Sequence, residues 1–151
     1  MKTTRILITI LILVLCMIPT AVFAAAETLP AGYAGNTDSL IDVKNPEAAV
    51  STTTNKVCVV SAVAVPGTVV TLYSFDGAQY NKMYSEGKAL EAEVGAAGLY
   101  AQSIELKNDV NTILVVATSG NSTETIKLDI TVVKTDVVEN IINIWQTLIN
   151  N

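Results

Sequence analysis

The sequence predicts an all-β protein, an antiparallel β-sandwich of seven to eight strands with one amphipathic α-helix added at its C-terminus. Three observations predict this class. Short β-type runs recur at intervals of about 10 residues, as in sandwich proteins. Turn-forming pairs such as Pro66-Gly67 and Asp76-Gly77 separate the runs. A helical period of apolar residues appears only in the last segment of the chain.

Residues 1–24 have the parts of a secretory signal peptide. Lys2 and Arg5 supply a positive start, an apolar run extends from Ile6 to Ile18, and small residues follow up to Ala24. The run is shorter than the roughly 20 apolar residues that span a bilayer. We therefore expect cleavage after Ala24 or Ala26, export from the cell, and no stable membrane insertion of the mature chain.

Composition excludes several functions. The net charge of the full chain is −5. Removal of the signal peptide takes away Lys2 and Arg5, so the mature chain has 7 basic and 14 acidic residues and a net charge of −7. A chain this acidic repels phosphate backbones, so nucleic acid is not an expected partner. The chain has no histidine, which excludes histidine-based catalytic triads and imidazole metal sites. Cys16 lies in the signal peptide and lacks the small residue that a bacterial lipoprotein site has directly before its cysteine. Cys58 is expected to be a small buried hydrophobic residue.

The mature chain divides into a leader, a sandwich and a terminal helix. Residues 25–38 contain Pro30, Gly32 and Gly35 and are expected to form a flexible leader. Residues 39–134 are expected to form the sandwich. Its predicted strands cover residues 39–43, 56–65, 68–75, 78–85, 88–94, 99–106, 110–118 and 123–133.

Alternation of apolar and polar residues predicts which face of a strand is buried. One face of each of the last two strands is apolar and is expected to line the core: Ile113, Val115 and Ala117, and Ile126, Leu128, Ile130 and Val132. The strand over 56–65 is apolar on both faces, with Val57, Val59, Val63 and Val65 on its outer face. We therefore expect another element to cover this strand.

Three segments carry a family resemblance. Residues 65–73, VPGTVVTLY, resemble the A-x-P-G-x-x-V-x-L/V-Y segment of bacterial Ig-like domains of the glucodextranase-B-like type, with Ala64 at the small position. Residues 111–121 are similar to the family's N-x-I-x-V-x-A-x-D-x-x-G-N strand and turn, and residues 98–106 to its G-x-F/Y strand. Ala62 and Ser119 depart from the family's glycine and aspartate, and the second departure weakens any carry-over of a loop calcium site. The resemblance implies an Ig-like sandwich, exported by a bacterium and acting as a spacer, binding module or adhesive unit.

Residues 135–151 are predicted to form an amphipathic helix. Asp136 and Glu139 can form a capping box at its start. Its apolar side is expected either to cover the outer face of the strand over 56–65 or to contact a second subunit or partner. The segment has no Lys or Arg, which argues against binding to anionic lipid. The candidate interaction residues on this side are Val137, Val138, Ile141, Ile144, Trp145 and Leu148.

Little in the sequence points to catalysis. Glu91 and Glu93 share one strand face, as a pair of glycosidase carboxylates would, but a solvated acidic strand explains them equally well. No repeated Asp pattern indicates calcium. We therefore expect a non-catalytic structural or interaction module, secreted or held at the bacterial surface, with no cofactor. The alternative is a small carbohydrate-binding module that uses Tyr80 and Tyr84 as stacking platforms.

Overall fold

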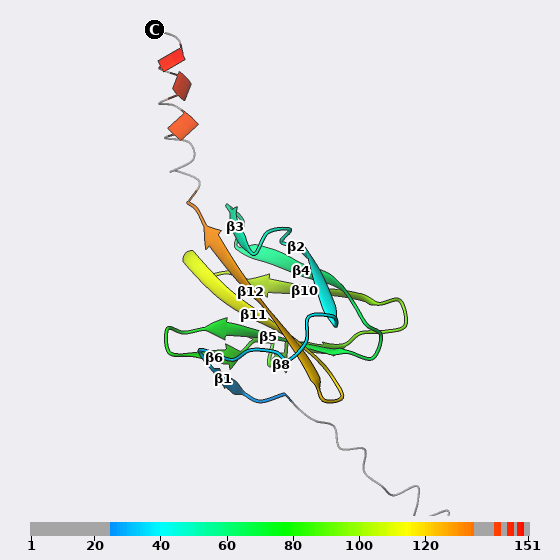
Figure 1. Ribbon diagram of the computed structural model, residues 1–151. Helices are drawn as coiled ribbons and strands as arrows, with labels where there is room; N and C mark the ends of the chain where they lie inside the picture. Colours follow the sequence, from blue (N-terminus) through cyan, green and yellow to red (C-terminus); the bar gives the residue numbers. More distant parts are fainter. Residues whose placement is uncertain (1–24, 135–140, 143–144, 147, 150–151) are drawn as a thin grey trace, which may run out of the picture.

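The computed structural model describes residues 25–134, and residues 141–142, 145–146 and 148–149 of the C-terminal segment. Within this part the protein is all-β. It has a seven-stranded mixed sheet, a three-stranded sheet and a two-stranded hairpin (Figure 1). In the described residues no helix is long and apolar enough to cross a membrane.

The large sheet is built around the hairpin of β11 (Asp109–Ser119) and β12 (Ser122–Val132), whose residues pair without interruption from Asp109↔Val132 to Ser119↔Ser122. Its strand order is β1-β6-β5-β11-β12-β3, and β9 also pairs with β5. The remaining strands are β1 (Thr28–Pro30), β3 (Val50–Thr53), β5 (Val69–Phe75), β6 (Gln79–Lys82) and β9 (Glu91–Glu93).

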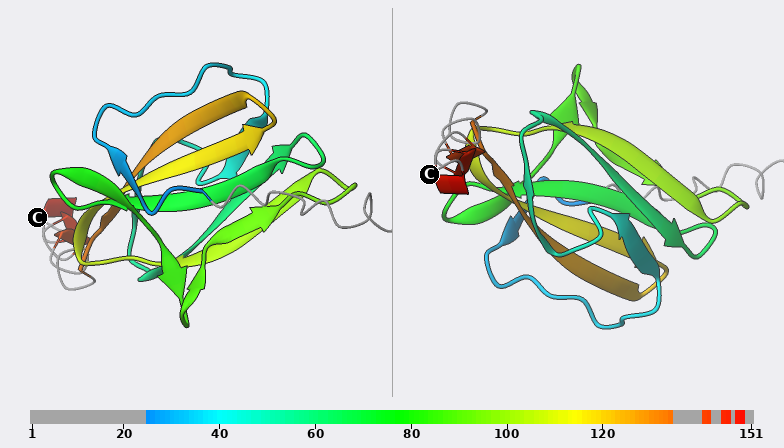
Figure 2. Two further views of the ribbon diagram at one scale, coloured as in Figure 1. Left: turned by 90° about the horizontal axis from the view of Figure 1, so that it is seen from below. Right: turned by 90° about the horizontal axis from the view of Figure 1, so that it is seen from above.

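The small sheet has the order β10-β4-β2, with β2 (Ile41–Asn45), β4 (Val57–Ala64) and β10 (Leu99–Glu105). The chain leaves this sheet after β2, at the cis peptide bond between Asn45 and Pro46, and joins the edge of the large sheet as β3. β7 (Tyr84–Ser85) and β8 (Lys88–Ala89) form a separate short hairpin, which projects from the body (Figure 2).

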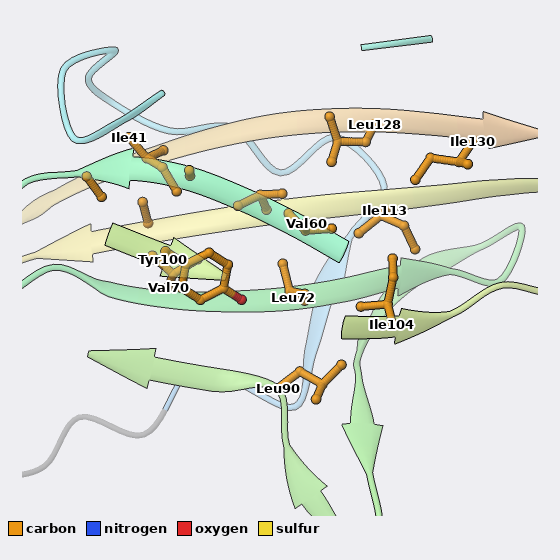
Figure 3. Packing of buried hydrophobic residues seen from close by; sticks show 14 of the residues in the cluster. Ile41, Val60, Val70, Leu72, Leu90, Tyr100, Ile104, Ile113, Leu128 and Ile130 are labelled. Atoms are coloured by element: carbon orange, nitrogen blue, oxygen red, sulfur yellow. The ribbon is translucent and has the colours of Figure 1, made fainter. Parts of the chain in front are cut away.

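The main core lies between the two sheets and includes side chains from both (Figure 3). The large sheet contributes Leu72, Ile113 and Leu128, and the small sheet contributes Val60 and Ile104, all at most 2% exposed. The predicted inner faces of the last two strands are confirmed. This cluster contains Ile113, Val115, Ala117, Leu128, Ile130 and Val132, and the partly buried Ile126 packs against it. Hydrophobic burial on alternate positions therefore fixes which way each strand faces.

A second apolar cluster covers the other face of the large sheet. It contains Leu114 and Val116 of β11 together with Leu29, Tyr73 and Tyr80. Leu29 comes from the segment 25–38, which the sequence predicts to be a flexible leader. That prediction differs from the structure, in which Thr28–Pro30 pairs with β6 and Leu29 is buried. The apolar outer face of β11 needs this cover, because water would otherwise reach it.

Several predicted turns are confirmed. The backbone is left-handed at Gly77, where β5 turns into β6, and at Gly98, before β10. A side chain at Gly98 would also lie 3.0 Å from the carbonyl oxygen of Ala64, so glycine is required there for two reasons. The Asp76 carboxylate completes the first turn by accepting hydrogen bonds from the N–H groups of Ala78 and Gln79, both at 2.9 Å.

Other expectations need correction. The pairing is not wholly antiparallel, because β3, which the strand prediction missed, lies parallel to β12. The runs over 78–85 and 88–94 each divide into two shorter strands. The predicted C-terminal helix over 135–151 has no support in the structure. Only three pairs of its residues are described, each with helical backbone, and residues 135–140, 143–144, 147 and 150–151 lie outside the described part.

Candidate interaction surface

The outer face of the small sheet carries exposed apolar side chains, interrupted on β4 by the half-buried Ser61 between Val59 and Val63. Val57, Val59 and Val63 project from β4 with 56%, 46% and 46% of their surface exposed, and Val65 follows at 45%. The alternate residues Val60, Ala62 and Ala64 are buried in the core. The prediction that β4 is apolar on both faces is confirmed. The predicted cover is absent from the described residues, where these valines remain exposed.

β10 extends this apolar surface sideways. Leu99 lies opposite Val63 in the antiparallel register and is 68% exposed, and the exposed Ala101 is the next residue on the same face. We call Val57, Val59, Val63, Val65, Leu99 and Ala101 the valine face. A protein surface with adjacent exposed apolar side chains commonly marks a binding site.

Polar residues border the valine face on both sides. On β2, Asp42 lies opposite Val63 and forms an ion pair with Lys44. On β10, Ser103 and Glu105 lie opposite Val59 and Val57. An apolar centre with a polar rim is the usual composition of a protein–protein interface.

The predicted C-terminal interaction residues are only partly described. Ile141, Trp145 and Leu148 are exposed, at 51%, 61% and 67%, and so are their apolar neighbours Ile142 and Ile149. Val137, Val138 and Ile144 lie outside the described residues. The described residues of this segment therefore present a second exposed apolar set on the same chain as the valine face.

The two tyrosines proposed as sugar platforms differ in exposure. Tyr80 is 5% exposed and packs on Phe75, with the ring centroids 5.0 Å apart, so it is not a surface platform. Tyr84 is 51% exposed and borders a cavity of about 380 Å³ together with Gln102 and Glu105. Its hydroxyl donates a hydrogen bond to the Glu27 carboxylate, and this bond raises the pKa of Tyr84.

The described residues give little support for other chemistry. Glu91 accepts a hydrogen bond from the Thr71 hydroxyl at 3.2 Å and lies 3.5 Å from the Lys82 ammonium, so it is engaged in structural contacts. No group of three or more acidic or cysteine side chains in this part of the chain is arranged to hold a metal ion. Cys58 is half-buried against the core, and burial raises the pKa of its thiol, which lowers its reactivity.

Sequence reasoning missed two features of the structure. It gave no role to Leu99, although a leucine beside a glycine turn at the start of a strand is an available signal. It also gave no role to Lys82 of β6, whose side chain is only 4% exposed.

Comparison with known proteins does not identify a family for this chain. A scan against models of protein families finds no match, and searches of curated proteins and of solved structures find none. The resemblance to bacterial Ig-like domains therefore rests on the motifs in the sequence and on the all-β arrangement.

Proposed function

We propose that the protein is an exported, non-catalytic interaction module with an Ig-like β-sandwich, and that it acts by self-association. The observation that carries this proposal is the valine face, a bordered apolar surface that the described residues leave exposed. The secretory leader and the family motifs support export by a bacterium and either secretion or retention at its surface.

The proposed occupant of the valine face is the C-terminal segment 135–151 of a second copy. This segment has 17 residues and in helical form is about 25 Å long. The eight steps from Val57 to Val65 cover about 26 Å of extended strand, so the lengths match. Ile141, Trp145 and Leu148 would supply the apolar contacts that the valines lack. The segment has no Lys or Arg and only two acidic residues, so charge repulsion is small.

Reciprocal exchange between two copies would bury two valine faces and two terminal segments at once. Twofold symmetry gives such a closed dimer without leaving an open apolar surface. In the alternative arrangement, the segment folds back onto its own sheet. Formation of the exchanged dimer depends on protein concentration, because two chains must meet, whereas folding back within one chain does not.

Trp145 is the only tryptophan of the chain and gives a direct readout. We expect its emission in chain 25–151 to shift to shorter wavelength as concentration rises, because the indole leaves water when a dimer forms. Val59→Lys should abolish the shift, and Val50→Lys, at a 73% exposed valine on β3, should not. A blue-shifted emission that is independent of concentration would support folding back, and unshifted emission at all concentrations would contradict both arrangements.

Carbohydrate binding is the second candidate function, and the exposed Tyr84 beside its cavity is the observation that favours it. Aromatic rings of this kind stack on sugars, the Gln102 amide can donate and accept hydrogen bonds, and the Glu105 carboxylate can accept them. Screening chain 25–151 on a glycan array tests this function. Binding that is lost in Tyr84→Ala and retained in Tyr33→Ala would support it, and an array without any binding would end it.

A further inference from the structure

Residues 25–27, which directly follow the predicted signal peptide, are held by polar side chains of β5 and β6 and by Tyr84. Lys82 lies at the end of β6 with its side chain 4% exposed. Its ammonium donates a hydrogen bond to the carbonyl oxygen of Ala25 and lies 3.4 Å from the Glu27 carboxylate and 3.5 Å from that of Glu91. A buried ammonium needs such partners, because loss of hydration is costly for a charge.

Tyr73 and Tyr84 hold the same short segment. The Tyr73 hydroxyl donates a hydrogen bond of 2.7 Å to the carbonyl oxygen of Ala26, and Tyr73 is 1% exposed. Burial raises the pKa of Tyr73 to about 12, so the hydroxyl keeps its proton at neutral pH. The Tyr84 hydroxyl bonds to the Glu27 carboxylate, and the backbone N–H of Lys82 donates to the Glu27 carbonyl oxygen at 2.9 Å.

These contacts distinguish the two cleavage sites that the leader sequence allows. Cleavage after Ala26 would remove the carbonyl oxygens of Ala25 and Ala26 together. The buried Lys82 ammonium would lose one acceptor and the buried Tyr73 hydroxyl would lose its only acceptor among the described residues. A buried donor that loses its acceptor destabilises the folded chain. Cleavage after Ala24 keeps every one of these contacts.

We propose that the bond between Ala24 and Ala25 is the processing site, and that Lys82, Tyr73 and Tyr84 form a seat for the new N-terminus Ala25-Ala26-Glu27. A leader peptidase hydrolyses this peptide bond with one water molecule. The C–N bond breaks, Ala24 leaves as a carboxylate with the leader, and Ala25 begins the mature chain as an ammonium. This inference rests on the export part of the proposed function, whereas the seat itself is a property of the folded chain.

Processing is tested by producing the full chain in a secreting bacterium and determining the intact mass and N-terminal sequence of the exported product. We expect a chain that begins at Ala25. A chain that begins at Glu27, lighter by two alanines, would overturn the processing site and leave export standing. An uncleaved precursor retained in the cell would overturn export as well.

The seat is tested without export. Chains 25–151 and 27–151 are released from a cleavable fusion that adds no residue, and their urea unfolding midpoints are compared. The shorter chain should unfold at a midpoint lower by roughly 1 M, because it lacks two buried acceptors. Equal midpoints would overturn the seat.

Two substitutions separate the seat from general effects of shortening the chain. Tyr73→Phe should lower the midpoint of chain 25–151 and have a much smaller effect in chain 27–151, where the hydroxyl has already lost its acceptor. Lys82→Met should lower the midpoint of chain 25–151, whereas Lys88→Met, at an exposed lysine of β8, should leave it unchanged. Equal effects of Tyr73→Phe in the two chains would contradict the seat.

Discussion

Glu124 occupies an inward position of β12, where the following residues at the same spacing, from Ile126 to Val132, are apolar. It is 7% exposed, and one carboxylate oxygen accepts hydrogen bonds from the N–H groups of Leu40 (2.7 Å) and Ile41 (2.9 Å). Since Ile41 begins β2, this side chain ties the small sheet to the large one. The alternation of β12 predicts the inward direction of position 124. The partners could not be predicted, because they lie more than 80 residues away in the sequence.

Glu124→Ala should lower the free energy of unfolding by about 3 kcal/mol, because two buried N–H groups lose a charged acceptor. Glu93→Ala, at an exposed position of β9, is the matched control and should change it by less than about 0.5 kcal/mol. Urea unfolding measures both. Equal effects of the two substitutions would show that the link between the sheets is unimportant.

The carboxyl group of Asp129 makes the free energy of unfolding depend on pH in the acidic range. The Thr112 hydroxyl, 2.6 Å away, and then the Lys127 ammonium, 3.0 Å away, lower the pKa of this carboxyl from its ordinary value of 3.8. A lowered pKa in the folded state stabilises the protein fully above 3.8, and this contribution is lost as the pH falls through the folded-state pKa. The difference in unfolding free energy between the native chain and Asp129→Asn should therefore shrink between pH 5 and pH 2. A constant difference over that range would contradict the assignment.

At the scale of elements, the prediction was most accurate for long strands and least accurate for the first segment. β4, β5, β10, β11 and β12 were located to within one or two residues, because each is a β-type run of seven or more residues. β1 has only three residues and ends in Pro30, and its partner β6 is 50 residues distant in the sequence, so no local pattern reveals the pairing. The sequence signal for β1 was the apolar pair Leu114 and Val116 on the outer face of β11, which another segment must cover.

The segment after β1 is also fitted closely to the sheet. The N–H of Asn36 donates to the carbonyl oxygen of Thr123 at 2.7 Å, and Gly35 approaches the same strand so closely that an added Cβ would lie 2.3 Å from that oxygen. Glycine is therefore required at position 35 by the contact with β12.

Gly35→Ala should lower the free energy of unfolding by about 1–3 kcal/mol, since the backbone of the segment must move away from β12. Gly32→Ala is the control, because no heavy atom lies within 4 Å of the Cβ it would add and Gly32 does not have a positive φ. Thermal or urea unfolding compares the two variants. If Gly35→Ala is as stable as Gly32→Ala, the segment is not fitted to the sheet.

At the scale of the whole molecule, the sequence predicted a sandwich with a shared core, and the pattern of apolar residues assigned an inner face to β11 and β12. It did not predict that the chain changes sheets between β2 and β3 or that β3 lies parallel to β12. Those features follow from pairings between distant segments. The candidate surface was predicted in part. The outward valines of β4 were identified but were expected to be covered, and the contribution of β10 depends on the register of Leu99 with Val63.

The molar mass in solution, measured by light scattering as a function of concentration, tests self-association most directly. The comparison is between chain 25–151 and chain 25–134, which retains every strand and the whole core of the described residues. We expect the longer chain to approach the mass of a dimer as concentration rises and the shorter chain to keep the mass of a monomer. If chain 25–151 keeps the mass of a monomer at every concentration, the proposal of self-association through the valine face is wrong.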